Sequence, residues 1–440
     1  MSTLTLAIIV VFVLGYALIA MESLTKINKA AVALLMFVFC WVLYMVDPSP
    51  FVQLMHPEFK GIGDQFVTFA NKLITEHLGD TATTLFFLMG AMTIVEIVDQ
   101  NGGFNWVKDV MRSKSKRSLL WKIAFMTFFL SAILDNLTTS IVMIMILRKL
   151  VQDHKDRMIY ASLVIIAANS GGAFSPIGDV TTIMLWNAGM ITAGGVISEI
   201  FIPSLISMII PAFVLQFLLK GKLGGDMLET DHSGDTELLE FNGSQRKIIF
   251  AIGVGGLCFV PVFHYFTDLP PFVGILLVLG ILWTITEIFY RSLHRSKGDS
   301  EDFSKRVSNL LSRIDMSTIL FFLGILMAVA CLEEVGVLHE LGGGLNSFFQ
   351  GNHYAVTGVI GVLSSIVDNV PLVAGSMGMY PVQATGDMAV DGIFWQLLAY
   401  CAGVGGSILI IGSAAGVVVM GLEKITFGWY MKKISWIAFL

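Results

Sequence analysis

Two short segments of this chain place an aspartate directly before an asparagine in apolar surroundings. They read SAILDNLTTS (residues 131–140) and SSIVDNVPLV (residues 364–373). A carboxylate can bind a proton or a cation, and an amide can offer its carbonyl oxygen to a cation or its NH₂ group to an anion. A site for small ions is therefore the first hypothesis, with helix capping as the structural alternative for each aspartate. The four candidate residues are Asp135, Asn136, Asp368 and Asn369.

A third polar group lies in the segment ANSGGAFSPIGDVTTIML, residues 168–185. Glycines and Pro176 in the middle of an apolar run predict that a helix unwinds there and leaves two half-helix ends beside freed carbonyl groups. The matching segment of the C-terminal half, GVGGSILIIGS, carries only serines near its break, so the site is predicted to be asymmetric in charge. Ser364, one turn before the second aspartate, either faces the same cavity or bonds its own backbone. The further candidates are Asn169, Asp179, Thr181, Thr182, Ser364, Ser407 and Ser413.

The elements that must position these residues are membrane helices. Of the 440 residues, 55% are hydrophobic and 14% are charged, and the mean hydropathy is +0.78. Soluble proteins carry about 25% charged residues. Apolar runs of about 18 residues or more predict an all-α polytopic membrane protein with the lipid bilayer, and no nucleic acid, as its partner. The predicted spans are 3–21, 29–46, 82–98, 196–220, 247–266, 271–290 and 317–337.

Basic residues in the connections predict the orientation of these spans. Residues 108–117, 148–157 and 291–313 are rich in Lys and Arg, whereas residues 338–354 and 381–392 contain neither. Because cytoplasmic connections carry the excess of positive charge, the first group is predicted to be cytoplasmic and the second external.

This orientation makes two of the apolar segments re-entrant hairpins. Segment 118–150 starts and ends on the cytoplasmic side, yet it is too short for two spans of about 20 residues and a turn. By the same reasoning, segment 355–380 enters and leaves from outside. Irregular backbone at membrane depth is tolerated only where it is buried in protein or lines a wet cavity. The two Asp-Asn tips are therefore expected to face each other.

Four matches in order predict that the chain contains an internal duplication. LFFL occurs at 85–88 and 320–323, and Ser-x-Ile-x-Asp-Asn recurs 233 residues downstream. In the two breaks, Gly171-Gly172 recurs as Gly405-Gly406 and Gly178 recurs as Gly412, both 234 residues downstream. The two LFFL spans run in opposite directions, so the repeats have inverted topology, as in secondary transporters with a midplane site. The predicted units are a first repeat at 1–220 with a broken helix at 158–190, a cytoplasmic linker at 221–246, and a second repeat at 247–440 with a broken helix at 393–423. Span 196–220 is expected to recur near 430–454, so the last helix is short or the chain is truncated.

Other polar residues in or near the spans have several interpretations. Glu96, Glu333 and Glu334 lie late in the two LFFL spans, where they form a proton path, form salt links or sit at the interface. His77 is predicted near the external surface. The segment 302–315, DFSKRVSNLLSRID, is predicted to be an interfacial amphipathic helix.

The three motifs resemble those of the NhaD family of sodium/proton antiporters, within the ion transporter superfamily that also holds dicarboxylate and arsenite permeases. The likeness covers nearly the whole chain. Relatives that carry dicarboxylates have Ser-Asn-Thr at the hairpin tips, where this chain has Asp135 and Asp368. Two carboxylates would repel a dianion and attract a cation, so this departure favours the antiporter.

The resemblance implies a secondary transporter, not an enzyme, that exports Na⁺ and Li⁺ in exchange for H⁺. It implies no cofactor, a homodimer and a bacterial inner membrane. Na⁺ is expected at Asp135, Asp179 and Asp368. A buried site disfavours the charged carboxyl, so a proton and Na⁺ compete for it. The alternatives are an anion permease of the same superfamily and an intramembrane aspartyl protease. The protease is disfavoured because the aspartates lack the Gly-x-Gly-Asp pattern of such enzymes.

Overall fold

The computed structural model describes residues 2–113, 115–219, 221, 241–297, 314–366 and 368–440. Most of the predicted linker and residues 302–313 of the predicted interfacial helix lie outside this part. The described residues form helices and no strand, with one isolated bridge between Gln383 and Ala389. The prediction of an all-α chain is therefore confirmed.

Seven of the described helices are long and apolar enough to cross a membrane. Five of them coincide with predicted spans, one contains the predicted span 82–98, and one is the first arm of the predicted hairpin 118–150. The predicted span 3–21 is the apolar helix α1, Thr3–Ala20. The seven are α3 (Lys29–Val46), α5 (Asp64–Gln100), α7 (Lys116–Leu134), α11 (Ala193–Leu215), α12 (Gly243–Thr267), α13 (Pro271–Lys297) and α15 (Met316–Glu334).

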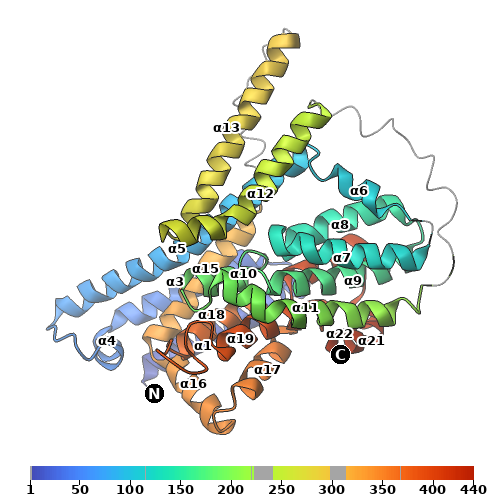
Figure 1. Cartoon of the computed structure of the whole chain (residues 1–440). Coiled ribbons are helices and arrows are strands. Elements are labelled where there is room, and N and C mark those ends of the chain that lie inside the picture. The colour runs from blue at the N-terminus through green and yellow to red at the C-terminus, as the bar shows by residue number, and fades with distance from the viewer. Residues whose placement is uncertain (1, 114, 220, 222–240, 298–313, 367) are drawn as a thin grey trace.

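One group of helices is built around α3 and α15, which pack along each other, and around α5, which packs on α12, α13 and α15. Helices α12 and α13 run side by side away from the rest of the molecule, whereas α16 (Val337–Phe348) lies at the opposite end (Figure 1). The short helices near this group are α2 (Glu22–Thr25), α4 (Ser49–Met55) and α6 (Asn105–Met111).

Helix α5 is much longer than its predicted span of 82–98. It begins at Asp64, directly after Gly63 with a φ of 56°, and continues for 37 residues. At 1.5 Å per residue this is about 55 Å, well beyond a hydrocarbon core of about 30 Å. No proline interrupts the polar first half, and Phe66, Ala70 and Leu73 are buried, so packing sustains the helix in a half too polar to be predicted as a span.

The second group contains the first Asp-Asn tip. Helices α7 and α8 (Asn136–Leu150) meet at Asp135 and pack against each other and against α9 (His154–Ala173). Lys116 at the start of α7 forms an ion pair with Asp156, and the Tyr160 hydroxyl donates to the Lys116 carbonyl at 2.8 Å. The start of α7 thus lies beside the start of α9, which follows the end of α8 directly. Both ends of segment 116–150 lie together, with the tip at the far end.

The second tip has the same arrangement. Helices α17 (His353–Ser364) and α18 (Asn369–Met379) are followed by α19 (Ile393–Gly405). The His353 ring lies 5.6 Å from that of Phe394, and the Tyr380 ring lies 4.8 Å from the same phenylalanine. The two ends of segment 353–379 therefore meet at the start of α19. Re-entry of either hairpin into a membrane from one side remains a prediction.

Both predicted helix breaks are present, between α9 and α10 (Val180–Asn187) and between α19 and α20 (Ala414–Glu423). Each hairpin packs on one broken helix through a glycine. A Cβ atom added to Gly171 would lie 2.1 Å from the backbone oxygen of Phe128, and one added to Gly405 would lie 2.2 Å from that of Gly361. The duplication relates these two contacts to each other. In both halves, therefore, the backbone of the hairpin lies directly against the backbone of the broken helix at the same position.

A buried acid joins elements of the two halves. The Glu423 carboxylate at the end of α20 accepts hydrogen bonds from Arg148 Nε at 2.7 Å and Arg157 Nε at 2.6 Å, and its side chain is fully buried. Arg148 lies near the end of α8, and Arg157 lies in the first turn of α9. The chain ends with α21 (Phe427–Lys433) and α22 (Ser435–Phe439), where the predicted last span begins.

Candidate functional site

Asp179 lies at the centre of the candidate site. It caps the N-terminus of α10, where its Oδ1 accepts the backbone N–H of Thr181 at 3.1 Å, and it is 1% exposed. Its Oδ2 also accepts Asn136 Nδ2 at 2.9 Å and Asn369 Nδ2 at 3.2 Å. Within the described residues, all hydrogen-bond donors to this carboxylate are uncharged. The two hairpin tips thus meet at Asp179 through their asparagines.

Asn169 connects this centre to the second helix break. Its Oδ1 accepts Asn136 Nδ2 at 3.1 Å, and its Nδ2 donates to Ser407 Oγ at 2.9 Å and Ser413 Oγ at 3.0 Å. Because Ser407 and Ser413 flank the break between α19 and α20, one network joins both hairpin tips and both breaks.

The N-termini of four helices converge on this network. Helices α8, α10, α18 and α20 are each capped by a side chain that accepts a backbone N–H of its own first turn. A helix N-terminus carries a partial positive charge, so the four ends partly offset the charge of the carboxylates. The capping residues are Asp135, Asp179, Asp368 and Ser413.

Asp135 is held in a strained backbone conformation. Its φ of 78° and ψ of 159° lie in a region that residues with a Cβ atom rarely adopt. The carboxylate accepts the backbone N–H of Thr138 at 2.7 Å and the Thr138 hydroxyl at 2.8 Å. The strain is consistent with a functional constraint at this tip, since such conformations cluster at functional sites.

Asp368 has an ordinary backbone, with a φ of −51°, and a different partner. Its Oδ2 lies 3.4 Å from the Nζ atom of Lys29 on α3. The prediction that the two tips face each other holds for the asparagines, which share one carboxylate. The two aspartates instead point to separate partners, Thr138 and Lys29.

Of the remaining predicted hydroxyl residues, Thr182 and Ser364 have local contacts, whereas the buried Thr181 hydroxyl has no hydrogen-bond partner among the described residues. Thr182 Oγ1 donates to the Asp179 carbonyl at 2.9 Å. Ser364 Oγ donates to the Ala402 carbonyl at 2.7 Å, and Ser131 donates to the Ala168 carbonyl at 2.6 Å, so both serines bind their hairpin to its broken helix. Ser364 therefore supports the site without reaching the central network.

Two further hydroxyl groups add oxygen atoms near the network: Ser170 belongs to the polar segment of the first helix break, whereas Thr139 was not singled out from the sequence. Thr139 lies on the face of α8 that carries Asn136, and Ser170 follows Asn169 on α9. Both are buried, and neither hydroxyl has a hydrogen-bond partner among the described residues. Helical spacing from Asn136 would have identified Thr139, but nothing in the sequence shows that its hydroxyl lacks a partner.

The glutamates proposed for a proton path lie elsewhere. Glu334, 6% exposed at the end of α15, binds two histidines: His56 Nε2 at 2.9 Å and His77 Nε2 at 2.8 Å. Glu333 is partly buried beside Gly378, and Glu96 accepts a hydrogen bond from Gln100 at 2.6 Å. The contact of His77 with Glu334 joins α5 to α15. No sequence pattern indicated that His56 would also bind this glutamate.

The chemistry of the site suits a small hard cation. Carboxylate, amide and hydroxyl oxygens surround a buried carboxylate, and hard alkali and alkaline-earth cations prefer oxygen ligands. Within the described residues, no cluster of three or more His, Cys, Asp or Glu has a geometry that would hold a resident metal ion.

Comparison with known proteins finds similarity to transporters. The family model described as a citrate transporter, CitMHS, matches residues 16–398. Sodium/proton antiporters 1 and 2 of Arabidopsis thaliana are 42% and 41% identical over 98% and 97% of this chain, covering 70% and 95% of their own lengths. The Na⁺/H⁺ antiporter NhaD of Alkalimonas amylolytica is 30% identical over 94% of this chain and 84% of its own.

Proposed function

The chain belongs to the citrate transporter family CitMHS and, within it, to the sodium/proton antiporters of the NhaD type, and from this premise we propose that it exchanges Na⁺ for H⁺ across a membrane. The observation that carries the proposal is Asp179, a fully buried carboxylate whose described donors are all uncharged. A buried carboxylate without a cationic partner is costly when ionised. Binding either a proton or Na⁺ removes that cost.

The exchange rests on competition for the carboxylates. Na⁺ binds Asp179 together with oxygen atoms of Asn169 and neighbouring hydroxyls, and Asp135 and Asp368 supply further negative charge at the two tips. When the proton concentration rises, protonation removes the negative charge and releases the ion. Because both species need the same oxygen atoms, they cannot occupy the site together, and each crosses the membrane only in exchange for the other.

Alternating access needs the site to open to each side in turn. Its position between two hairpins and two broken helices supports inverted repeats at 1–220 and 247–440, with the hairpins entering the membrane from opposite sides. Movement of the hairpins and broken helices relative to the group around α3 and α15 would then expose Asp179 alternately.

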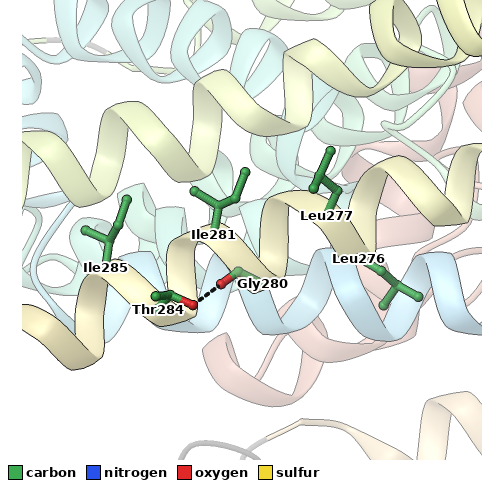
Figure 2. A pocket seen from close by; sticks show the side chains of 6 residues that line it. All are labelled: Leu276, Leu277, Gly280, Ile281, Thr284 and Ile285. Carbon is green, nitrogen blue, oxygen red and sulfur yellow. Dashed lines mark hydrogen bonds between the residues drawn. The ribbon is translucent and has the colours of Figure 1, made fainter.

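Three finer assignments complete the proposal. Li⁺ is carried as well as Na⁺, because it is a small hard cation that oxygen ligands accept. The transporter acts in a bacterial inner membrane; its relatives include the NhaD antiporter of Alkalimonas amylolytica as well as the more similar antiporters of Arabidopsis thaliana. It functions as a homodimer: α13 presents an apolar groove with a small-residue centre at Gly280, which allows another helix to approach closely (Figure 2). The groove is lined by Leu276, Leu277, Gly280, Ile281, Thr284 and Ile285.

An anion permease is the second candidate, because the matching family model is described as a citrate transporter. A carboxylate substrate would have to enter a site that already holds the Asp179 carboxylate and has two further aspartates at its edge. This charge distribution disfavours a dianion and favours a cation.

Inverted membrane vesicles distinguish the two. A proton gradient is established, and its collapse is followed by the fluorescence of a pH-sensitive dye after addition of Na⁺, Li⁺, K⁺, citrate or succinate. Sodium/proton exchange predicts collapse on addition of Na⁺ and Li⁺ and none with citrate or succinate. Uptake of citrate or succinate with no response to Na⁺ would refute the proposal.

A further inference from the structure

The two equivalent aspartates of the hairpin tips differ in charge environment as well as in backbone conformation: Asp368 has a positively charged neighbour. The Lys29 Nζ atom lies 3.4 Å from Asp368 Oδ2, and the two side chains are 25% and 17% exposed. Asp135, which precedes Asp368 by the shift of the duplication, binds Thr138 instead, and the ion pairs of the described residues do not include it. The charge at the two tips is therefore unequal.

Lys29 is positioned by elements outside the hairpin. It is the first residue of α3, whose cap Asn28 donates to Ser317 Oγ on α15 at 2.9 Å. The backbone N–H of Lys29 donates to Glu22 Oε1 at 3.1 Å. Its ammonium group lies 4.2 Å from the ring centroid of Phe321, also on α15. Such a cation–π contact favours one position of an otherwise flexible lysine.

The pair consequently spans two structural groups. Lys29 and Phe321 belong to the packed pair α3 and α15, whereas Asp368 lies at the tip of the hairpin α17–α18. An ammonium group and Na⁺ are both monovalent cations that bind carboxylate oxygens. Only one of them can lie directly against Asp368 Oδ2 at a time.

We propose that Lys29 is a tethered competitor of Na⁺: its ammonium group neutralises Asp368 when no ion is bound, and Na⁺ must displace it to use that carboxylate. The inference rests on the proposed function and extends it by one residue that sets the affinity for Na⁺. Lys29 acts through Asp368 and is a positioning residue, with no role as a ligand. Displacement involves no bond making or breaking, and the ammonium group keeps its proton.

The test measures Na⁺-dependent proton movement in proteoliposomes that contain the purified full chain. Lys29→Met removes the charge and keeps an unbranched side chain one atom shorter, and Lys29→Gln is a second neutral variant. Without the competitor, the KM for Na⁺ should fall about fivefold, the factor that a partly exposed ion pair is worth. Lys29→Arg keeps the charge and should keep the KM of the unmodified protein.

Lys72→Met is the matched control, because Lys72 is an exposed lysine of α5 that pairs with Glu76 at 3.2 Å. This variant also removes one positive charge, but at a position away from the site, and it should leave the KM for Na⁺ unchanged. An unchanged or higher KM in both neutral Lys29 variants, with the unmodified protein active, would overturn the inference. If the unmodified protein moves no protons on addition of Na⁺, the proposed function fails instead.

Direct binding of radioactive Na⁺ gives a readout that does not depend on turnover. In the Asp368→Asn background, adding Lys29→Met should not change the affinity, because the group that the lysine competes for has lost its charge. Tighter Na⁺ binding in that double variant would show that Lys29 acts elsewhere and would refute the proposal.

Discussion

Asp179 and Ser413 begin α10 and α20 with nearly the same backbone angles, a φ of −141° and a ψ of 149° for Asp179 and a φ of −141° and a ψ of 154° for Ser413. Each side chain accepts a backbone N–H of its own helix. The two halves thus keep one capping geometry and differ in charge. This separates the capping role of Asp179, which an uncharged side chain can fill, from its role in binding ions.

Asp179→Asn tests that separation. Asparagine caps helices about as well as aspartate, so the variant should fold, but it removes the buried charge. We expect exchange to fall at least about 100-fold, the factor that corresponds to about 3 kcal/mol for a lost buried charge interaction. The initial rate of Na⁺-induced collapse of the proton gradient measures it. Ser413→Ala removes the equivalent cap and the hydroxyl to which Asn169 donates, so it should lower stability by about 1 kcal/mol and reduce exchange far less than Asp179→Asn, because the buried charge stays. Full exchange in Asp179→Asn would contradict the assignment.

Asp135→Asn should fold and should not exchange, because it keeps the cap to Thr138 and loses the charge. Asp135→Gly should also be inactive but no less stable. Glycine relieves a backbone strain of about 1 to 3 kcal/mol, whereas the lost cap costs about 1 kcal/mol. Thermal unfolding in detergent, together with the vesicle assay, measures both effects. An active Asp135→Asn variant would contradict the need for a charge at this tip. A glycine variant that unfolds at a much lower temperature than the unmodified protein would contradict the backbone strain.

Gly171→Ala should destabilise the protein by about 1 to 3 kcal/mol or more, because the added Cβ atom would meet a backbone oxygen of Phe128 at 2.1 Å. Gly194→Ala is the matched control: it lies in the first turn of α11, and a Cβ atom there would meet nothing within 4 Å. The thermal midpoints of the two variants provide the comparison. Equal midpoints would mean that the hairpin and the broken helix are less closely packed than the contact indicates.

Glu334→Gln tests whether this buried glutamate carries protons or anchors helices. Its bonds to His56 and His77 favour the anchor. We expect the variant to lose about 1.5 to 3 kcal/mol of stability, as for hydrogen bonds to a charged group, and to keep its exchange rate per folded molecule. The rate is normalised to the folded fraction measured by size-exclusion chromatography. A large loss of rate at unchanged stability would instead support the proton path.

Most of the fold could be predicted from the sequence, because the hydropathy pattern, the charges of the connections and the duplication can each be identified from the residues alone. The short length of 118–150 between two basic connections predicted a hairpin, and the contacts of Lys116 with Asp156 and Tyr160 bring the ends of 116–150 together. The extension of α5 was missed because its first half is polar and is stabilised by tertiary packing.

The site was predicted by residue type but not by pairing. Asn136, Asn169, Asp179 and Asn369 meet as the motifs indicated. Lys29 was missed because a lysine at the start of an apolar run is usually an interfacial residue, and no pattern relates it to Asp368. Such pairings depend on how distant helices pack, which a single sequence does not reveal.

The buried contact of Glu423 with Arg148 and Arg157 has a mechanical consequence. Separating these side chains would leave a buried charge without a partner, at a cost of about 3 to 5 kcal/mol. We therefore expect helices α8 and α9 of the N-terminal half to move together with α20 of the C-terminal half. The set of helices that moves together would then contain parts of both duplicated halves, so neither half would move independently of the other.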